Sequence, residues 1–203
     1  DGIGKEYRWI KGICGGEISY YTSNDQKNFL NPKGMYGWTW EAAAAKYHIS
    51  YMLASSAPGG KYATVERFRE AGIASGYSFR VSNCRTNGSE TRLTVSNQGI
   101  APIYRDAYFA IGNVQSDISL RGLLPGKGLD IVIPAALVDA DDLQIVSPYI
   151  LPTQKIEFET GEFTAVDNVE VPNSSAVKQL KDGQIVIIRN NCKYTLMGQM
   201  IDK

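Results

Sequence analysis

The hydrophobic pattern of this chain changes at Gly76, and the change limits the folds open to it. Over residues 7–75, short apolar runs alternate with helix-forming runs in the order strand, helix, strand, helix. After Gly76, apolar and polar residues alternate with a period of two, as in the run from Tyr77 to Ser82. The first pattern is typical of β/α units, and the second of sheets with one buried and one wet face. The sequence therefore predicts a mainly β protein with an α/β N-terminal part.

The N-terminal part is predicted to hold two strands and two helices. Ala42 to Ala45 are strong helix formers, and Thr39 and Thr64 each stand where a side-chain oxygen can cap a helix. The apolar and aromatic residues before Gly15-Gly16 indicate a largely buried strand. We expect strands at 7–21 and 48–53, helices at 40–47 and from 64 to Gly72 or Gly76, and polar loops at 22–37 and 55–60.

The part after Gly76 is predicted to be an antiparallel β-sandwich, because short strands are separated by turns rich in Gly, Pro and Asn. Strand-like runs fall at 77–82, 92–96, 107–111, 118–121, 129–133, 143–146 and 156–158. Residues 160–176 read as a polar linker, and Asn190-Asn191 as the turn of a C-terminal β-hairpin. The expected division is 1–75 for the β/α segment, 76–160 for the sandwich, and 161–203 for the linker and hairpin.

Composition excludes some classes of partner. Lys plus Arg and Asp plus Glu each number 21, so the net charge is zero. A chain with this balance has no general attraction for nucleic acid, and no polybasic run favours an anionic membrane. No stretch reaches the ~20 apolar residues that a membrane-spanning helix needs. We therefore expect no nucleic-acid partner and no membrane-spanning segment.

The potential metal ligands are sparse. Cys14, Cys84 and Cys192 have spacings that match no zinc or redox motif, and His48 is the only histidine. The cysteines are more simply interpreted as small buried hydrophobic residues. We expect no metal site and no cofactor.

Four motifs in the first half of the chain are similar to those of a known family. They are Gly15-Gly16-Glu17, Tyr47-His48-Ile49-Ser50-Tyr51, the run from Gly76 to Val81 and the run from Ser96 to Tyr104. In order and spacing, residues 11–112 resemble the bacterial family known as domain of unknown function 4832, common in gut Bacteroidetes. That family often follows a module like a glycoside-hydrolase barrel. The resemblance implies that residues 7–75 correspond to the last two β/α units of such a barrel, with the sandwich after it.

The tail carries a second resemblance. Val171-Pro172-Asn173, the run from Asp182 to Arg189 and the run from Tyr194 to Gln199 resemble the C-terminal sorting domains of the Bacteroidetes type nine secretion system. Ser174 stands where that family has the second Pro of Pro-Asn-Pro. The resemblance implies an exported protein, located outside the cell or at the cell surface.

Glu17 is the candidate catalytic residue. It follows its predicted strand through two glycines, and catalytic groups of β/α barrels stand at the C-terminal ends of strands. A retaining glycosidase needs a second carboxyl group about 5–5.5 Å away. In such enzymes that group comes from an earlier strand, which this chain lacks. The alternative is a structural carboxylate that hydrogen-bonds a loop backbone.

Tyr36, Trp38, Trp40 and His48 are the candidate carbohydrate-binding residues. Aromatic rings can stack on sugars, and Trp38 and Trp40 flank a single residue, so both could face one side of an extended segment. The alternative is that the aromatic residues cover the core. A lone histidine at a strand start is more often packed and hydrogen-bonded than catalytic.

Two hypotheses of function follow. The first is an uncharacterised, non-catalytic accessory module of a secreted or surface protein, associated with carbohydrate and binding a glycan. The second is the C-terminal part of a glycoside hydrolase whose remaining barrel lies on a missing N-terminal module or a partner chain. Two β/α units cannot close a barrel, and their open strand edges invite pairing. We therefore expect a homodimer formed through residues 7–20 and 48–53, strands that join the sandwich, or strands that belong to a different fold than the family implies.

Overall fold

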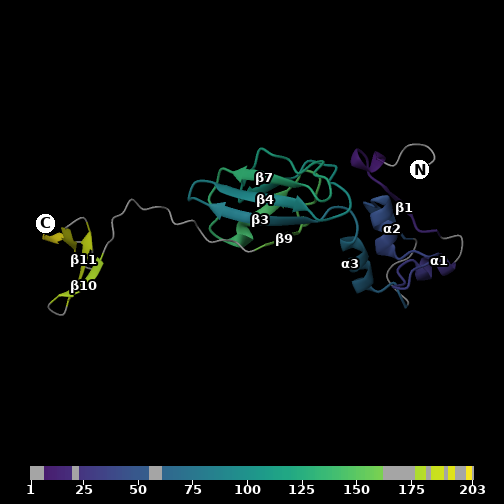
Figure 1. Ribbon diagram of the computed structural model, residues 1–203, viewed down its shortest axis with the longest axis horizontal. Coiled ribbons are helices and arrows are strands. Elements are labelled where there is room, and N and C mark those ends of the chain that lie inside the picture. Colours follow the sequence, from purple (N-terminus) through teal and green to yellow (C-terminus); the bar gives the residue numbers. More distant parts are fainter. Residues whose placement is uncertain are drawn as a thin grey trace. The chain divides into compact units, whose positions relative to one another are not determined.

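The computed structural model of the chain divides into two compact units, Asp1–Ala165 and Val166–Lys203. It describes residues 7–19, 23–54 and 61–161 in full, together with the backbone of strands between 177 and 202. Few helices and many strands make up these residues, which confirms a mainly β protein with some helix (Figure 1). The predicted boundary between residues 75 and 76 falls inside the first unit and stays a prediction.

Among its described residues, the N-terminal part contains a small parallel sheet and three α-helices. Strands β1 and β2 pair in parallel, with Gly15 opposite Tyr51 and Glu17 opposite Leu53. The elements are η1 (Arg8–Ile10), β1 (Gly15–Glu17), α1 (Ser23–Asn28), α2 (Trp40–Tyr47), β2 (Tyr51–Leu53) and α3 (Val65–Ile73).

The two larger helices begin where their caps predict. The Thr39 hydroxyl accepts a hydrogen bond from the Ala42 amide at 3.2 Å, and α2 has the predicted bounds. The Thr64 hydroxyl accepts from the Arg67 amide, also at 3.2 Å, at the start of α3. Such caps satisfy amides that have no partner within the helix, and each contributes about 1 kcal/mol.

The strand predicted for residues 7–21 was largely wrong. Residues 8–10 form a 3-10 turn, and the strand is limited to 15–17, where Gly15 and Glu17 are exposed rather than buried. Residues 20–21 fall outside the described ranges. The strand predicted to begin at His48 begins at Tyr51, because His48 adopts the left-handed conformation that ends α2. The segment predicted as a loop at 22–37 contains α1.

Two sheets occupy the described residues between Gly76 and Gly161. One has the order β7-β4-β3-β9 and the other β6-β5-β8. Strand β9 pairs with β3 in parallel, so the larger sheet is mixed and not purely antiparallel as predicted. The bounds are β3 (Phe79–Thr86), β4 (Thr91–Asn97), β5 (Tyr108–Ile111), β6 (Val114–Gln115), β7 (Gly128–Ile133), η2 (Ala140–Asp142), β8 (Leu143–Val146) and β9 (Phe158–Thr160).

The strand predicted at 118–121 is absent from the described structure. Leu120 donates its amide to the Ala107 carbonyl at 2.8 Å, and the Ser119 hydroxyl donates to the Asp106 carboxylate at 3.1 Å. These are separate bonds and not a ladder. The segment therefore crosses the start of β5 without joining its sheet.

The buried faces of both sheets share one hydrophobic core. It includes Phe79 and Val81 of β3, Val95 of β4, Phe109 of β5 and Ile145 of β8. The predicted alternation is confirmed along β4, where every second residue is buried. Each such side chain contributes about 1.5–3 kcal/mol when fully buried.

A second, smaller core lies under the helices. Leu30, Trp40, Ala44, Ile49 and Ala71 form it, and the Trp40 indole N–H donates to the Ala71 carbonyl at 2.9 Å. Val65 at the start of α3 is exposed, whereas Phe68, three residues later, packs against this core.

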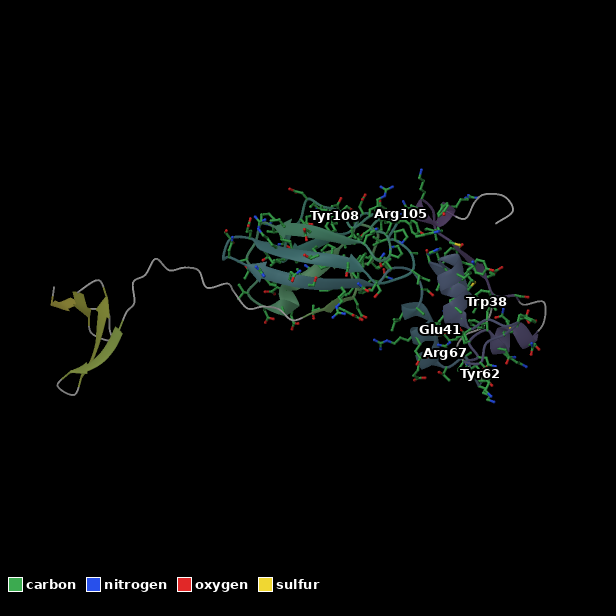
Figure 2. All side chains as sticks on the ribbon, in the orientation of Figure 1. Trp38, Glu41, Tyr62, Arg67, Arg105 and Tyr108 are labelled. Atoms are coloured by element: carbon green, nitrogen blue, oxygen red, sulfur yellow. The ribbon has the colours of Figure 1, made fainter. Side chains whose placement is uncertain are left out.

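An ion-pair network joins α2 to α3. The Arg67 guanidinium lies 2.6 Å from the Glu41 carboxylate and donates to the Leu30 carbonyl at 3.0 Å. Figure 2 labels Glu41 and Arg67 beside one another on the helices. The network holds the residue 30 loop and the two helices together.

The C-terminal unit is a four-stranded antiparallel sheet in chain order. Its strands are β10 (Val177–Lys181), β11 (Gln184–Arg189), β12 (Cys192–Tyr194) and β13 (Met200–Asp202). Arg189 pairs with Cys192 across β11 and β12. The predicted turn at Asn190-Asn191, most of the predicted linker at 160–176 and the tail's side chains lie outside the described residues.

Candidate functional site

The four aromatic and histidine candidates do not form one site. Tyr36 and Trp38 lie on an exposed turn, in which the Met35 and Trp38 backbones bond to each other at 2.8 and 3.1 Å. The Tyr36 hydroxyl donates to the Asp25 carboxylate at 2.8 Å, and this bond raises the pKa of Tyr36. The Trp38 ring lies 6.4 Å from that of Tyr47, centroid to centroid. The turn and the end of α2 therefore present three exposed aromatic rings, those of Tyr36, Trp38 and Tyr47.

Trp40 and His48 pack against other residues of the fold and are not free to bind a ligand. Trp40 is 7% exposed, so its ring offers no free face to a ligand. His48 stacks on Trp9, with ring centroids 3.6 Å apart and planes 12° from parallel. Its Nδ1 donates to the Ile100 carbonyl at 2.6 Å, which requires the proton on Nδ1 because a carbonyl oxygen only accepts. Both residues take the packing role weighed as the alternative.

Glu17 is exposed at the last position of β1. Its carboxylate makes no hydrogen bond or ion pair with the described residues, so no neighbour orients it for acid–base chemistry. The adjacent glycines have different roles. A Cβ at Gly15 would clash with the Tyr51 backbone carbonyl oxygen and lie 2.5 Å from the Tyr51 ring, whereas a Cβ at Gly16 would meet nothing within 4 Å. Glycine at position 15 therefore permits the close approach of the neighbouring strand backbone and the Tyr51 ring.

The structure contains a tyrosine-lined cleft that the sequence did not predict. The cleft has a volume of about 580 Å³ and is bounded by β2, the end of α3, residues 102–105 and residues 147–150. Tyr51, Tyr77 and Tyr149 line it with 48%, 37% and 58% of their surface exposed. We call it the tyrosine cleft. Its described lining comprises four tyrosines, three serines, one arginine and otherwise glycine, proline and isoleucine.

The side of the cleft formed by residues 102–105 is fixed by Asn97. The Asn97 side chain is fully buried; its oxygen accepts from the Ser78 and Gly99 amides, and its nitrogen donates to the Ala101 and Leu123 carbonyls, at 2.8–3.1 Å. These bonds hold residues 98–101, which lead into the wall. The position of this wall is thus set by a buried polar network.

Close backbone contact joins the N-terminal part to this wall. The Gly76 amide donates to the Ile49 carbonyl at 2.8 Å, while the Gly76 carbonyl accepts from Ile100 and Ala101 at 2.9 Å. A Cβ at Gly99 would lie 2.5 Å from the Gly76 carbonyl oxygen, so glycine is required there for the close approach.

Several cleft side chains are held by their neighbours. The Tyr77 ring stacks on Phe79 at 5.1 Å, and burial raises the Tyr77 pKa. The Tyr104 hydroxyl donates to the Trp9 carbonyl at 2.5 Å. Burial raises the Tyr104 pKa. These tyrosines are protonated at neutral pH and act as neutral hydrogen-bonding groups.

Arg105 provides the charge of the cleft. Its guanidinium carbon lies 5.1 Å from the centroid of the Tyr149 ring, a cation–π geometry. Figure 2 labels Arg105 on the part that contains the larger sheets. The described lining of the cleft contains no Asp, Glu, Lys or His. The cleft can therefore stack on rings, bond hydroxyl groups and attract an anion, but it offers no carboxyl pair for hydrolysis.

A second cleft, of about 590 Å³, lies beside β8 and has a different character. Its lining includes Asp141, Lys155 and Glu157, and its one aromatic residue among those described is Phe158. Opposite charges and few rings make it a weaker candidate for a sugar site.

The comparisons with known proteins give no relative. No family model, curated protein or solved structure matches the chain. The two resemblances noted from the sequence therefore stay predictions. The described residues contain no group of three or more metal-ligating side chains and no helix long and apolar enough to cross a membrane.

The sequence carried an indirect signal for the cleft. The motif from Ser96 to Tyr104 contains Asn97, Gly99 and Tyr104, which fix or line one wall. Tyr51 belongs to a second of these motifs, the run from Tyr47 to Tyr51, and also lines the cleft. What the sequence could not give was the contact between these segments, which depends on long-range pairing.

Proposed function

We propose that this chain is a non-catalytic accessory module that binds a glycan. The tyrosine cleft carries the proposal, because it combines concave shape, exposed aromatic rings and hydroxyl groups with a described lining free of carboxylates. Sugar rings present C–H faces that stack on aromatic rings, and their hydroxyls bond to serine and tyrosine side chains. Tyrosines held by packing lose little conformational freedom on binding.

The test is binding of polysaccharides by affinity gel electrophoresis and calorimetry, with tyrosine variants. Tyr149→Ala removes the most exposed tyrosine ring of the cleft. Because this ring is exposed, the variant should stay folded. Losing one stacking ring is expected to cost about 1.4 kcal/mol of binding free energy, a tenfold loss of affinity. Trp38→Ala is the matched control, since it removes an exposed ring outside the cleft lining.

Each outcome decides between the two aromatic surfaces. A tenfold loss in Tyr149→Ala, with Trp38→Ala unchanged, supports the cleft. A tenfold loss in Trp38→Ala, with Tyr149→Ala unchanged, places the binding site at the exposed rings of Tyr36, Trp38 and Tyr47 instead. If the native protein binds no polysaccharide in the panel, the glycan proposal is wrong.

We also propose that the chain is exported and that residues 76–160 form the sandwich of the family it resembles. The shared core of the two sheets supports the sandwich. The tail's resemblance to a sorting domain supports export, as does its being a separate compact unit. Deleting residues 171–203 should stop delivery to the cell surface; normal delivery of the truncated protein would contradict the proposal.

One observation favours the glycoside-hydrolase alternative. Strands β1 and β2 pair in parallel with α1 and α2 between them in the chain, and Glu17 stands at the carboxyl end of β1. This arrangement matches a β/α unit of a barrel. The coding sequence upstream of Asp1 tests it. Six more β/α units there, with activity lost in Glu17→Gln of the longer protein, would establish the alternative.

The same small sheet supports the homodimer. Strands β1 and β2 form a sheet of their own in the described structure and do not join the larger sheets. Their outer edges can pair with a second copy. Light scattering at micromolar concentration tests this association, and a monomeric mass would refute it.

A further inference from the structure

The tyrosine cleft has a charge that a site for neutral sugars does not need. Arg105 is exposed, and within the described part of the chain its guanidinium makes no ion pair. The neighbouring Asp106 is engaged elsewhere: its carboxylate accepts from the Ser119 hydroxyl at 3.1 Å and lies 3.9 Å from the Arg121 guanidinium. Arg105 thus keeps an uncompensated positive charge at the cleft.

The surroundings of Arg105 make this charge effective. The guanidinium lies over the Tyr149 ring, a contact that limits its motion. No described residue of the lining carries a negative charge to neutralise it. A concave site with one sign of charge concentrates its field on a ligand. The whole chain is neutral, so the effect is local to the cleft and not a general basicity.

Guanidinium has a preferred type of ligand. Its planar fork of N–H donors matches the two oxygens of a carboxylate, or two oxygens of a sulfate or phosphate, and forms charge-assisted hydrogen bonds. The adjacent tyrosines supply ring faces within the same cleft. The ligand that satisfies both features is a sugar ring that carries an anionic group.

We infer that the tyrosine cleft selects anionic glycans, with Arg105 binding the anionic group and the tyrosines stacking on the sugar rings. The inference rests on the proposed glycan-binding function and adds the class of glycan. The anion can be the carboxylate of a uronic acid or a sulfate ester, since both present the same paired oxygens to arginine.

The test uses one polymer in a charged and a neutral form. Polygalacturonate and its fully methyl-esterified form share a backbone, so they differ at the carboxylate alone. The native protein should bind polygalacturonate at least tenfold more tightly by calorimetry. Arg105→Gln should remove that preference and leave affinity for the ester unchanged. The second arm compares dextran sulfate with dextran. If the protein prefers dextran sulfate and shows no preference for polygalacturonate over its ester, the recognised group is sulfate.

The control variant separates a specific site from bulk charge. Arg80→Gln removes the same charge from an exposed position on β3, outside the described cleft lining. It should bind as the native protein does, and the melting temperature of both variants checks their folding. Equal affinity for charged and neutral polymers overturns the inference and leaves glycan binding intact. Equal weakening by both arginine variants also overturns it. Binding to none of the four polymers overturns it as well, whereas the failure of the broader polysaccharide panel is what refutes the proposed function.

Discussion

Replacing Asn97 with alanine should destabilise the protein by about 3–5 kcal/mol. The side chain is fully buried and makes four hydrogen bonds, two accepted from amides and two donated to carbonyls. Alanine leaves all four backbone groups without this partner. Each buried group left unsatisfied costs about 1–3 kcal/mol, and the total is reduced where water enters the space. About 1 kcal/mol for each group gives the expected range.

The variant Asn97→Asp provides a sharper test because its effect depends on pH. One carboxylate oxygen can still accept from the Ser78 and Gly99 amides. The other faces the Ala101 and Leu123 carbonyls, to which the amide nitrogen of asparagine donates. Burial and these two carbonyls should raise the folded-state pKa of the introduced carboxyl above its unfolded value of ~3.9. The variant is then most stable below that unfolded value and loses stability as pH rises through the folded pKa.

Urea unfolding followed by circular dichroism measures both effects. Asn113→Ala is the control, because Asn113 is exposed and should stay within about 0.5 kcal/mol of the native protein. A loss below about 1 kcal/mol in Asn97→Ala would refute the reasoning. So would an Asn97→Asp variant whose deficit, relative to the native protein, is the same at pH 4 and pH 8.

Two further predictions concern titratable groups. The ion pair with Arg67 holds the pKa of Glu41 below its ordinary value. The native protein should therefore be more stable than Glu41→Gln at pH values above the ordinary glutamate pKa, and this extra stability is lost as pH falls through the lowered pKa. Glu41 is half exposed, so the unfolding free energies of the native protein and Glu41→Gln, measured in urea across this pH range, should differ by less than about 1 kcal/mol. Burial raises the pKa of the Cys84 thiol, so in a Cys192→Ser background a disulfide reagent should modify Cys14 quickly and Cys84 slowly. A single fast phase for both thiols would contradict the second prediction.

Local signals allowed α2 and α3 to be predicted closely. Thr39 and Thr64 cap α2 and α3 through bonds to residues three positions later, and that information lies within one turn of chain. Period-two alternation likewise located β4 and β7 to within one or two residues, because a sheet with one buried face imposes that period.

The errors fall where distant contacts decide the conformation. The apolar run that includes Trp9 was read as a buried strand, but Trp9 stacks on His48 and its carbonyl accepts from Tyr104. Trp9 is therefore apolar because it packs against residues distant in the sequence, and not because it belongs to a sheet. The parallel pairing of β9 with β3 is similarly invisible to a local pattern.

The candidate site shows the same limit. Spacing placed Trp38 and Trp40 on one side of an extended segment, whereas α2 begins at Trp40 and turns it into the core. Trp38 stays exposed on the preceding turn. Two aromatic residues flanking one position share a face when the backbone is extended, and a helix start between them breaks that relation. The start was itself predicted from Thr39, so the two expectations were in conflict from the beginning.

The tyrosine cleft lies where the part with the helix core meets the part with the sheet core. This position explains how the cleft can have its shape before a ligand binds. Its walls are joined by backbone bonds of Gly76 to Ile49 on one side and to Ile100 and Ala101 on the other. Asn97 fixes the second wall from within the fold. A ligand would therefore meet walls already in position and would lose less affinity to ordering them. The exposed tyrosines contribute little to either core, so the lining can be changed with small effects on stability, and binding can be tested apart from folding.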